Sequence, residues 1–298
     1  MRFIYQGLLT ADDPRTRGLL QNAIFPTATM LENGSMRLFF GAPDRGRDFI
    51  FYLDVHPSRP THATTQAVYC LEHGQAGTFD ADSVLPASPL PCSESLRLYY
   101  SGRQKVVGRP YVEYVGLAHS HDDVHFRRAS HTPICDRTDQ SLFVRGQACV
   151  TERDGTFHMW YVGAGQWQQV EGREAPCGRI FHMTSKDGLS WPAQGHLCLG
   201  PRKDREMGLY RPWVIRTQGF WHMWASARHL DGAGSILAAR SRDGTSWERD
   251  EHPVSFVRAP ADLRADQLSC LQGPQQGLAF FRTTAPQPGI AIALMDPI

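Results

Sequence analysis

The sequence predicts an all-β protein, a five-bladed β-propeller that forms one domain over residues 1–298. Three observations support this fold class: a strand–turn–strand pattern found five times, a hairpin motif found three times, and two chain ends that complement each other. The composition agrees, because 27 glycines and 20 prolines among 298 residues are typical of many short strands joined by tight turns.

The first pattern is a strand, a polar turn and an aromatic-rich strand that ends in small residues. In the third copy, Phe157, Met159 and Tyr161 alternate with other large side chains, which suits strands covered on both faces. The five copies divide the chain into units of roughly 60 residues. They lie at residues 25–42, 85–102, 147–163, 211–227 and 268–283.

The second pattern is a hairpin motif, Ser-x-Asp followed by an aromatic residue six positions after the serine. Asp-Gly pairs at 187–188 and 243–244 predict tight turns, because glycine tolerates the positive φ that such turns require. Each unit therefore has four strands, and four-stranded antiparallel units repeated around an axis make a β-propeller. The paired serines and aromatics are Ser120 and Phe126, Ser185 and Trp191, and Ser241 and Trp247.

The two ends of the sequence complement each other. The last unit runs GIAIALMDPI and stops where its fourth strand should begin, and the first residues, MRFIYQGLL, resemble that strand. We expect the N-terminal strand to join the C-terminal blade and close the ring, which removes exposed strand edges.

The stretch LAHSHDDVHF (117–126) permits two interpretations. The spacing of His119, His121 and His125 is compatible with a zinc site. However, alternate side chains of a strand point to opposite faces, and the sister copies make Asp122 a turn residue. The sequence therefore favours a turn, and we expect neither a metal ion nor a cofactor.

Charge and cysteine usage indicate the setting in which the protein works. With 31 basic and 30 acidic residues, the net charge is close to zero and gives no electrostatic reason to expect binding to nucleic acid or to an anionic membrane. No stretch approaches the roughly 18 apolar residues of a membrane helix, and the start does not resemble a secretory signal. Seven cysteines without CxxC spacing favour reduced thiols. We expect a cytoplasmic protein with a small-molecule partner.

In a propeller, functional side chains are expected where the innermost strands begin, around the central funnel. Each of the five units offers polar residues at that place. They are Gln21 and Asn22, Asp80 and Asp82, Arg145 and Gln147, Glu206 and Arg211, and Asp266 and Gln267.

Two of these acids can form a catalytic pair. Asp82 or Asp80 can meet Glu206 across the funnel, and glycoside hydrolysis needs one protonated and one ionised carboxyl group. Alternatively, Asp80 caps a turn and Glu206 pairs with Arg205 or Arg211. The sequence leaves both possibilities open.

Arginines and aromatics near the funnel suggest ligand contacts. Arg145, Arg211 and Arg228 can hold a carboxylate or phosphate through paired hydrogen bonds, or they can neutralise the acids. Trp167 can stack on the apolar face of a sugar ring or belong to the core. For Trp213, which lies in a predicted strand, the core is favoured.

The recurring Ser-x-Asp-Gly hairpins and the stretches GTFDADSVLPASPL (77–90), YVGLAHSHDDVHF (114–126) and RPWVIRTQGFWHMWASAR (211–228) resemble a known superfamily. It is the five-bladed propeller superfamily of glycoside hydrolases, which includes families 43, 32 and 68. Closer still is the similarity to glycosidase-like proteins of bacterial surface-polysaccharide and related biosynthetic gene clusters.

The resemblance implies three acidic positions, of which this sequence matches two. An Asp base belongs at the entrance of the first blade, where LLQNAIFPTAT has Asn22 and no acid. Asp80 or Asp82 matches the second Asp, and Glu206 matches the Glu acid. Hydrolysis by the mechanism of the family is therefore in question.

Three functions remain open at this stage. The first is a carbohydrate-active enzyme in which Glu206 is the general acid, Asp82 or Asp80 is its partner, and other polar residues bind substrate. The second is a non-catalytic protein that binds a sugar or sugar phosphate. The third is a transferase or cyclase that acts on an anionic biosynthetic intermediate. The expected substrate-binding residues are Arg145, Gln147, Arg211, Arg228, Asn22 and Trp167.

Overall fold

The computed structural model describes residues 1–298 except 45, 171, 273–275 and 297–298. Strands dominate the described residues, and the one helix among them is α1 (Pro14–Gln21). The side chain of Asp13 caps this helix by accepting a hydrogen bond from the backbone N–H of Thr16 at 2.7 Å. The prediction of a nearly all-β protein is confirmed.

Most strands fall into five groups of four, which we call blades 1 to 5. Blade 1 contains β2 (Ile24–Met30), β3 (Met36–Asp44), β4 (Arg47–Val55) and β5 (Val68–Leu71). Blade 2 contains β6 (Ser83–Cys92), β7 (Ser95–Val106), β8 (Arg109–Ser120) and β9 (Arg127–Arg128). Blade 3 contains β10 (Val144–Arg153), β11 (Thr156–Ala164), β14 (Arg179–Ser185) and β15 (His196–Leu199).

Blades 4 and 5 complete the set. Blade 4 contains β16 (Glu206–Thr217), β17 (Phe220–His229), β18 (Gly234–Ser241) and β19 (Glu248–Arg249). Blade 5 contains β21 (Arg264–Leu271), β22 (Gly277–Ala285), β23 (Gly289–Met295) and β1 (Phe3–Leu8). Outside the groups, β20 (Phe256–Val257) pairs with β1, and β12 (Trp167–Val170) forms a hairpin with β13 (Arg173–Pro176).

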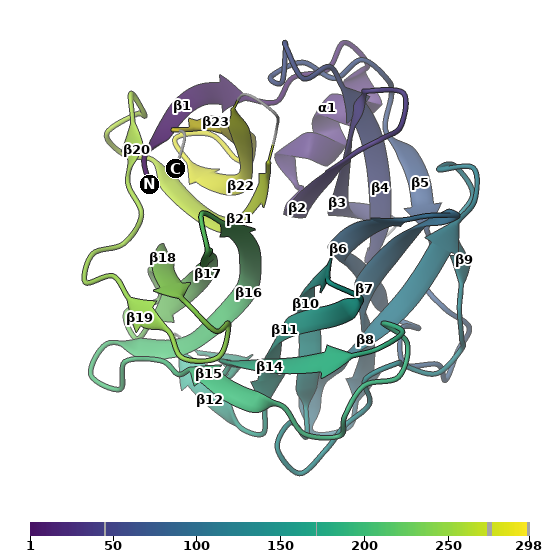
Figure 1. Ribbon diagram of the computed structural model, residues 1–298, viewed down its shortest axis with the longest axis vertical. Coiled ribbons are helices and arrows are strands. Elements are labelled where there is room, and N and C mark those ends of the chain that lie inside the picture. Colours follow the sequence, from purple (N-terminus) through teal and green to yellow (C-terminus); the bar gives the residue numbers. More distant parts are fainter. Residues whose placement is uncertain (45, 171, 273–275, 297–298) are drawn as a thin grey trace.

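The five blades surround a common centre (Figure 1). The first strand of each blade is innermost, and neighbouring inner strands contact one another in the order β2, β6, β10, β16 and β21. β21 also contacts β2. Short parallel bridges link β4 to β6 and β8 to β10, so blades 1 to 3 share one hydrogen-bonded sheet.

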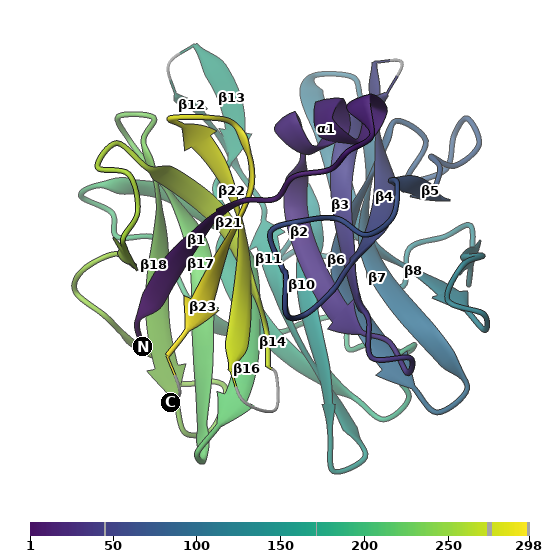
Figure 2. The ribbon, with the colours of Figure 1, turned by 90° about the horizontal axis from the view of Figure 1, so that it is seen from above.

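The N-terminal strand lies in the C-terminal blade. β1 pairs antiparallel with β23, with Phe3 opposite Met295, so the first strand and the last strand of the chain lie side by side (Figures 1 and 2). The first residues of the chain thus supply the fourth strand of the last blade, and they cover the edge that β23 would otherwise expose.

The core lies between neighbouring blades. Met159, Trp160, Tyr161 and Val162 are consecutive residues of β11, and all four are fully buried. Because successive side chains of a strand point to opposite faces, β11 is covered on both sides. Trp213 also belongs to the core, where its indole N–H donates to the carbonyl of Cys270 at 2.7 Å.

The repeated Ser-x-Asp hairpins share one geometry. In each, the serine hydroxyl donates to the aspartate at 2.9 Å, as Ser185 does to Asp187. The same aspartate oxygen accepts the backbone N–H groups two and three residues later. The hydrogen bond with the His125 side chain is the largest cause that holds the pKa of Asp122 well below its usual range, and the backbone N–H groups do the same for the pKa of Asp187 and Asp243.

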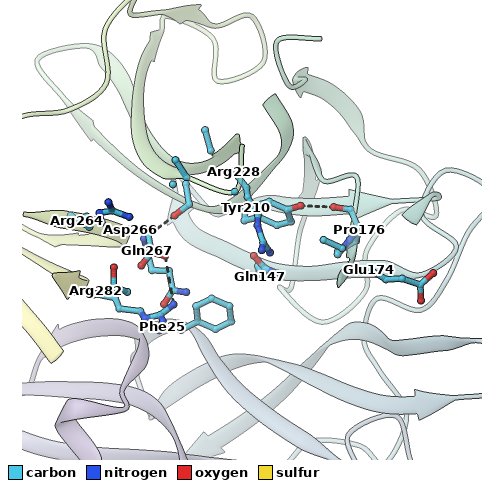
Figure 3. Close-up of a pocket in the computed structure, with 18 of the residues that line it drawn as sticks. Phe25, Gln147, Glu174, Pro176, Tyr210, Arg228, Arg264, Asp266, Gln267 and Arg282 are labelled. Atoms are coloured by element: carbon cyan, nitrogen blue, oxygen red, sulfur yellow. Dashed lines mark hydrogen bonds and ion pairs between the residues drawn. The ribbon is translucent and has the colours of Figure 1, made fainter. Parts of the chain in front are cut away.

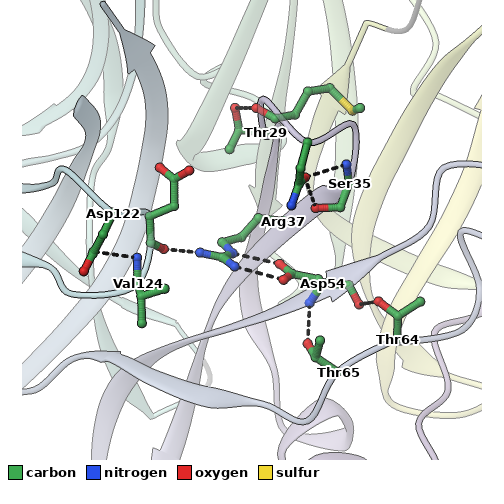
Figure 4. A network of polar contacts seen from close by, with 11 residues as sticks. Thr29, Ser35, Arg37, Asp54, Thr64, Thr65, Asp122 and Val124 are labelled. Carbon is green, nitrogen blue, oxygen red and sulfur yellow. Dashed lines mark hydrogen bonds and ion pairs between the residues drawn. The ribbon is translucent and has the colours of Figure 1, made fainter. Parts of the chain in front are cut away.

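Each hairpin turn also receives a side chain of the preceding blade. The Tyr99 hydroxyl donates to the carbonyl of Gly188 at 2.9 Å, and the Trp160 indole N–H donates to that of Gly244 at 2.9 Å. In blade 1, Arg37 makes a bidentate ion pair with Asp54 and donates to the carbonyl of Asp123 (Figure 4). The repeated turns therefore latch one blade to the next.

Two of the three histidines of 117–126 have hydrogen-bond partners at turns. His125 Nδ1 lies 2.6 Å from Asp122 Oδ2, and His121 Nδ1 lies 2.8 Å from the carbonyl of Glu94. Among the described residues, no three His, Cys, Asp or Glu side chains are grouped to hold a metal ion.

Two further expectations concern the whole chain. All seven cysteines are free thiols. In the part of the chain that the structure describes, no helix has the length and apolarity needed to cross a membrane.

Candidate functional site

The inner strands share a β-bulge at the same place. The register of each inner strand shifts there, and the bulged residue has a positive φ of 55° at Phe25, 52° at Gln147, 53° at Arg211 and 56° at Gln267. In β6 the shift lies between Pro86 and Ser88. A bulge leaves its backbone N–H without a ladder partner and redirects side chains, so bulges are common beside functional sites.

Side chains of the preceding blade satisfy these N–H groups. Gln267 Oε1 accepts the N–H of Phe25 at 2.8 Å, and Gln147 Oε1 accepts that of Arg211 at 3.0 Å. Ser101 and Ser226 accept the N–H groups of Gln147 and Gln267 at 2.7 and 2.8 Å. These contacts fix the inner strands relative to one another, including blade 5 relative to blade 1.

Arg211 spans the centre of the molecule. From blade 4, its guanidinium donates to the carbonyl of Ala87 in blade 2 at 2.8 Å and to that of Phe25 in blade 1 at 3.3 Å. The guanidinium also lies 5.0 Å from the centre of the Phe25 ring. Burial lowers the pKa of Arg211 to about 10. The side chain is fully buried and ties three blades together.

A pocket of about 650 Å³ lies against this centre (Figure 3). Phe25, Gln147, Tyr210 and Gln267 line it from the inner strands. The hairpin β12–β13 contributes Glu174, Ala175 and Pro176. The remaining polar lining residues include Arg103, Tyr111, Arg228, Arg264, Asp266 and Arg282.

Asp266 is the acid of the pocket nearest to the inner strands. It precedes the bulge residue Gln267, and its Oδ2 lies 3.6 Å from Arg282 Nη1, while its Oδ1 has no hydrogen-bond partner among the described residues. Burial raises the pKa of Asp266, and the charge of Arg282 opposes that rise only in part. A carboxyl group of this kind retains its proton to higher pH than usual.

A second acid, Glu174, lies on the opposite side of the pocket (Figure 3). Its Oε1 accepts a hydrogen bond from Arg109 at 2.6 Å. Between the two acids, Tyr210 donates its hydroxyl to the carbonyl of Pro176. The pocket therefore contains two carboxyl groups in different environments, one beside Arg282 and one paired with Arg109.

The comparisons with solved structures concern the fold. An α-L-arabinofuranosidase from Lactobacillus brevis is 12% identical, with 93% of this chain and 91% of that chain covered and a TM-score of 0.70. A thermostable family-43 glycoside hydrolase is 16% identical over 91% of this chain and 88% of that one, with a TM-score of 0.67. A family-32 β-fructofuranosidase of Bombyx mori is 13% identical, with 98% and 61% covered and a TM-score of 0.66.

The fold is that of the β-propeller glycoside hydrolases. The similarity of the sequence to this superfamily is thus confirmed at the level of fold, whereas the closer link to biosynthetic gene clusters stays a prediction.

Comparison with known sequences says less about this chain than comparison with solved structures does. No protein-family model matches the chain. Two uncharacterized proteins from strains of Mycobacterium tuberculosis are 29% identical over 180 residues. The match covers 60% of this chain and 58% of the length of those relatives.

All three expected catalytic acids, Asp80, Asp82 and Glu206, lie outside the lining of the pocket. Asp80 is buried and accepts hydrogen bonds from Arg128 at 2.7 Å and Tyr100 at 2.9 Å. Glu206 is buried in a bidentate ion pair with Arg249 and also accepts the N–H of Arg202 at 2.8 Å. In both, an acid beside the inner strand is paired with an arginine of the outermost strand, β9 or β19.

Burial and hydrogen bonding act on the pKa of Glu206 in opposite directions. Burial raises its pKa, but the hydrogen bonds from Arg249 and Arg202 outweigh burial and lower it overall. A general acid needs the opposite shift. The catalytic role of Glu206 stays a prediction, and its surroundings are those of an ionised structural carboxylate.

The other expected residues divide between the pocket and elsewhere. Gln147 and Arg228 line the pocket.

The remaining expected residues have partners elsewhere. Asp82 accepts the N–H of Lys105 at 2.8 Å, and Asn22 ends α1, where its side chain donates to the carbonyl of Gly18 at 3.0 Å. Arg145 donates to the carbonyls of Asp136 and Pro192, at 3.1 and 2.5 Å. Trp167 packs edge-on against Tyr111, 5.1 Å between ring centres, and Tyr111 itself lines the pocket.

Sequence reasoning missed most of the arginines of the pocket, although one signal was present. Ser101-Gly-Arg103 and Ser226-Ala-Arg228 occupy the same place in blades 2 and 4. The serine hydroxyl accepts a bulge N–H, and the arginine two residues later points to the same face of the strand. Copies two and four of the repeat end at residues 102 and 227, so the arginine that follows each of them lies just outside the repeated pattern.

Proposed function

We propose that this protein is a carbohydrate-active, glycoside hydrolase-like enzyme that binds a sugar or sugar-like molecule in the 650 Å³ pocket. The observation that carries the proposal is Asp266, a carboxyl group of raised pKa that faces a pocket at the inner strands of a glycosidase-type fold. The neighbours that share this fold are glycosidases, which makes a glycosidic bond the first candidate for the bond that is cleaved.

The proposal takes the five blades as one closed ring. Support comes from the pairing of β1 with β23, the contact of β21 with β2, and the hydrogen bond from Phe25 to Gln267. A closed ring has no free sheet edges. It also holds the pocket side chains of blades 1 to 5 at fixed separations, as a preorganised site requires.

The chemistry follows from the two carboxyl groups. Asp266, whose raised pKa favours the protonated form, donates its proton to the leaving oxygen, which becomes an alcohol as the bond from that oxygen to the anomeric carbon breaks. Glu174, which is paired with Arg109, accepts a proton from the water that adds to this carbon. Gln147 and Arg228 bind the sugar.

A panel of 4-nitrophenyl furanosides and pyranosides, neutral and acidic, tests this proposal. We expect nitrophenolate release by the wild-type protein, and a loss of kcat of at least about 100-fold in Asp266→Asn with little change in KM, because general acids contribute 10²–10⁴-fold. Asp262→Asn, an exposed acid outside the pocket, is the matched control and should match the wild type. Full activity of Asp266→Asn would refute the assignment.

Glu206→Gln decides between the sequence-based role of Glu206 and its observed contacts. We expect the variant to lose stability, because Arg249 stays partly buried without its counter-charge, at a cost of about 3 kcal/mol. Thermal melting and turnover are measured on the same sample. Loss of turnover at an unchanged melting temperature would instead restore Glu206 as the general acid.

A second candidate is a non-catalytic propeller that binds a sugar or sugar phosphate. The observation that favours it is the pairing of Asp80 with Arg128 and of Glu206 with Arg249, which leaves the acids matched by the family resemblance outside the pocket. Binding of a sugar without turnover of any glycoside would establish this candidate.

We also propose a cytoplasmic setting and a role in polysaccharide or related biosynthesis. Seven free cysteines, of which Cys70, Cys135, Cys149 and Cys270 are buried, suit a reducing compartment. Fractionation of the native host cells, with an antibody against the chain, tests the location.

A further inference from the structure

The charges around the pocket do not balance. Four arginines line it, namely Arg103, Arg228, Arg264 and Arg282. Of the described residues that line it, two are acidic, Asp266 and Glu174. The question is which of the four guanidinium groups already has an acidic side chain as a partner.

Two of the four arginines have partners. Arg103 donates through Nε to the buried Glu113 at 2.7 Å, and Arg282 lies 3.6 Å from Asp266. Glu174 does not neutralise a pocket arginine, because its ion pair is with Arg109, which does not line the pocket.

Arg228 and Arg264 are the remaining two. Neither guanidinium has a hydrogen bond or an ion pair with any residue in the described part of the chain. Burial raises the pKa of Tyr111 and Tyr210, and the positive charge of Arg228 opposes that rise in both phenols, in Tyr111 after the larger effect of Arg103. Arg264 comes from blade 5, beside Asp266 (Figure 3).

From this surplus we propose that the ligand of the pocket is an anionic sugar, whose carboxylate or phosphate group is held by Arg228 and Arg264. The inference rests on the proposed sugar-binding function and narrows its substrate class. A guanidinium presents a planar fork of N–H groups that fits both kinds of anion. Two such forks on different blades bind one anionic group, or two groups of one ligand, with hydroxyls left to Gln147 and Gln267.

Calorimetric titration with three probes tests the proposal: glucose, glucuronate and glucose 6-phosphate, with inorganic phosphate as a fourth, sugar-free probe. We expect glucuronate or glucose 6-phosphate to bind at least about tenfold more tightly than glucose, because hydrogen bonds to charged groups are the stronger ones. The stronger of the two identifies the anionic group. A preference that weakens with added salt would agree.

Substitutions of single arginines test which side chains hold the anionic group. Arg228→Met and Arg264→Met should each reduce the affinity for the preferred anion about tenfold, and reduce the affinity for glucose by less. Arg59→Met removes an exposed arginine outside the pocket and is the control of equal charge change. If Arg228→Met melts early, Arg228→Lys replaces it, since lysine retains the charge without the fork.

The outcomes separate the two proposals. Equal affinities for glucose and both anionic sugars would overturn the anionic preference while the sugar-binding function stands. Binding of none of the three sugars would overturn the sugar-binding function itself. Inorganic phosphate bound as tightly as glucose 6-phosphate would also overturn the anionic-sugar assignment, because the sugar would then contribute nothing.

Discussion

At the scale of single residues, Gly188 shows why two of the three repeated hairpins have glycine at this position. Its φ is +70°, and a Cβ there would lie 2.6 Å from the Tyr99 hydroxyl and 2.8 Å from Arg97 Nη1. This close approach belongs to the contact between blades 2 and 3, because Tyr99 donates to the carbonyl of Gly188 and Arg97 donates to that of Asp187. In the first copy the corresponding residue is Asp123, with φ +60°.

Gly188→Ala should therefore cost more than the backbone conformation alone. We expect about 1 kcal/mol for a positive φ and about 1–3 kcal/mol more for displacing Tyr99. Gly34→Ala is the matched control, because Gly34 has φ +79° and open space around its Cβ position. Urea unfolding of both variants measures the difference, and equal losses would mean that Tyr99 moves aside without cost.

At the scale of elements, strands β11 and β14 bring two histidines together. His158 Nδ1 lies 3.1 Å from His182 Nε2, and both rings pack against Trp160. Burial and the neighbouring His158 and His196 lower the pKa of His182 to about 4, with a small opposing effect of Asp243. Burial also lowers the pKa of His158.

This pair predicts a loss of stability in mild acid. Because the folded pKa of His182 is depressed to about 4, the unfolded chain binds protons first as pH falls below about 6.5. The free energy of unfolding should decrease between pH 6.5 and 4 by an amount on the order of 2–3 kcal/mol. Stability curves of wild type and His182→Phe measure it, and His131→Phe, an exposed histidine, is the control. A pH response that survives in His182→Phe would contradict the prediction.

The elements were more predictable from sequence than the site. Hairpins such as Ser185-x-Asp187-Gly188 are fixed by local hydrogen bonds, so their residues are near in sequence and visible as a repeat. By contrast, Arg128 neutralises Asp80 and Arg249 neutralises Glu206 from more than 40 positions away. Neighbouring residues in the sequence identify an acid as a candidate, but they do not show whether an arginine far away in the sequence already forms an ion pair with it.

At the scale of the whole molecule, Arg211 joins blades 1, 2 and 4. Arg211→Met should lower the free energy of unfolding by about 2 kcal/mol, because two buried carbonyls lose their donor. Arg240→Met, in the same blade but exposed and paired with Glu248, should change it by less than about 0.5 kcal/mol. Chemical denaturation measures both. An unchanged Arg211→Met would mean that relief of the buried charge offsets the lost hydrogen bonds.

The same side chain bears on access to the proposed pocket. Arg211 lies between the inner strands, with its guanidinium against Phe25 and its backbone N–H bonded to Gln147, two residues of the pocket lining. Because the side chain is fully buried and joins three blades, we expect no open passage beside it. A sugar in the proposed pocket would then enter and leave through one opening, and a polysaccharide would insert only one of its ends.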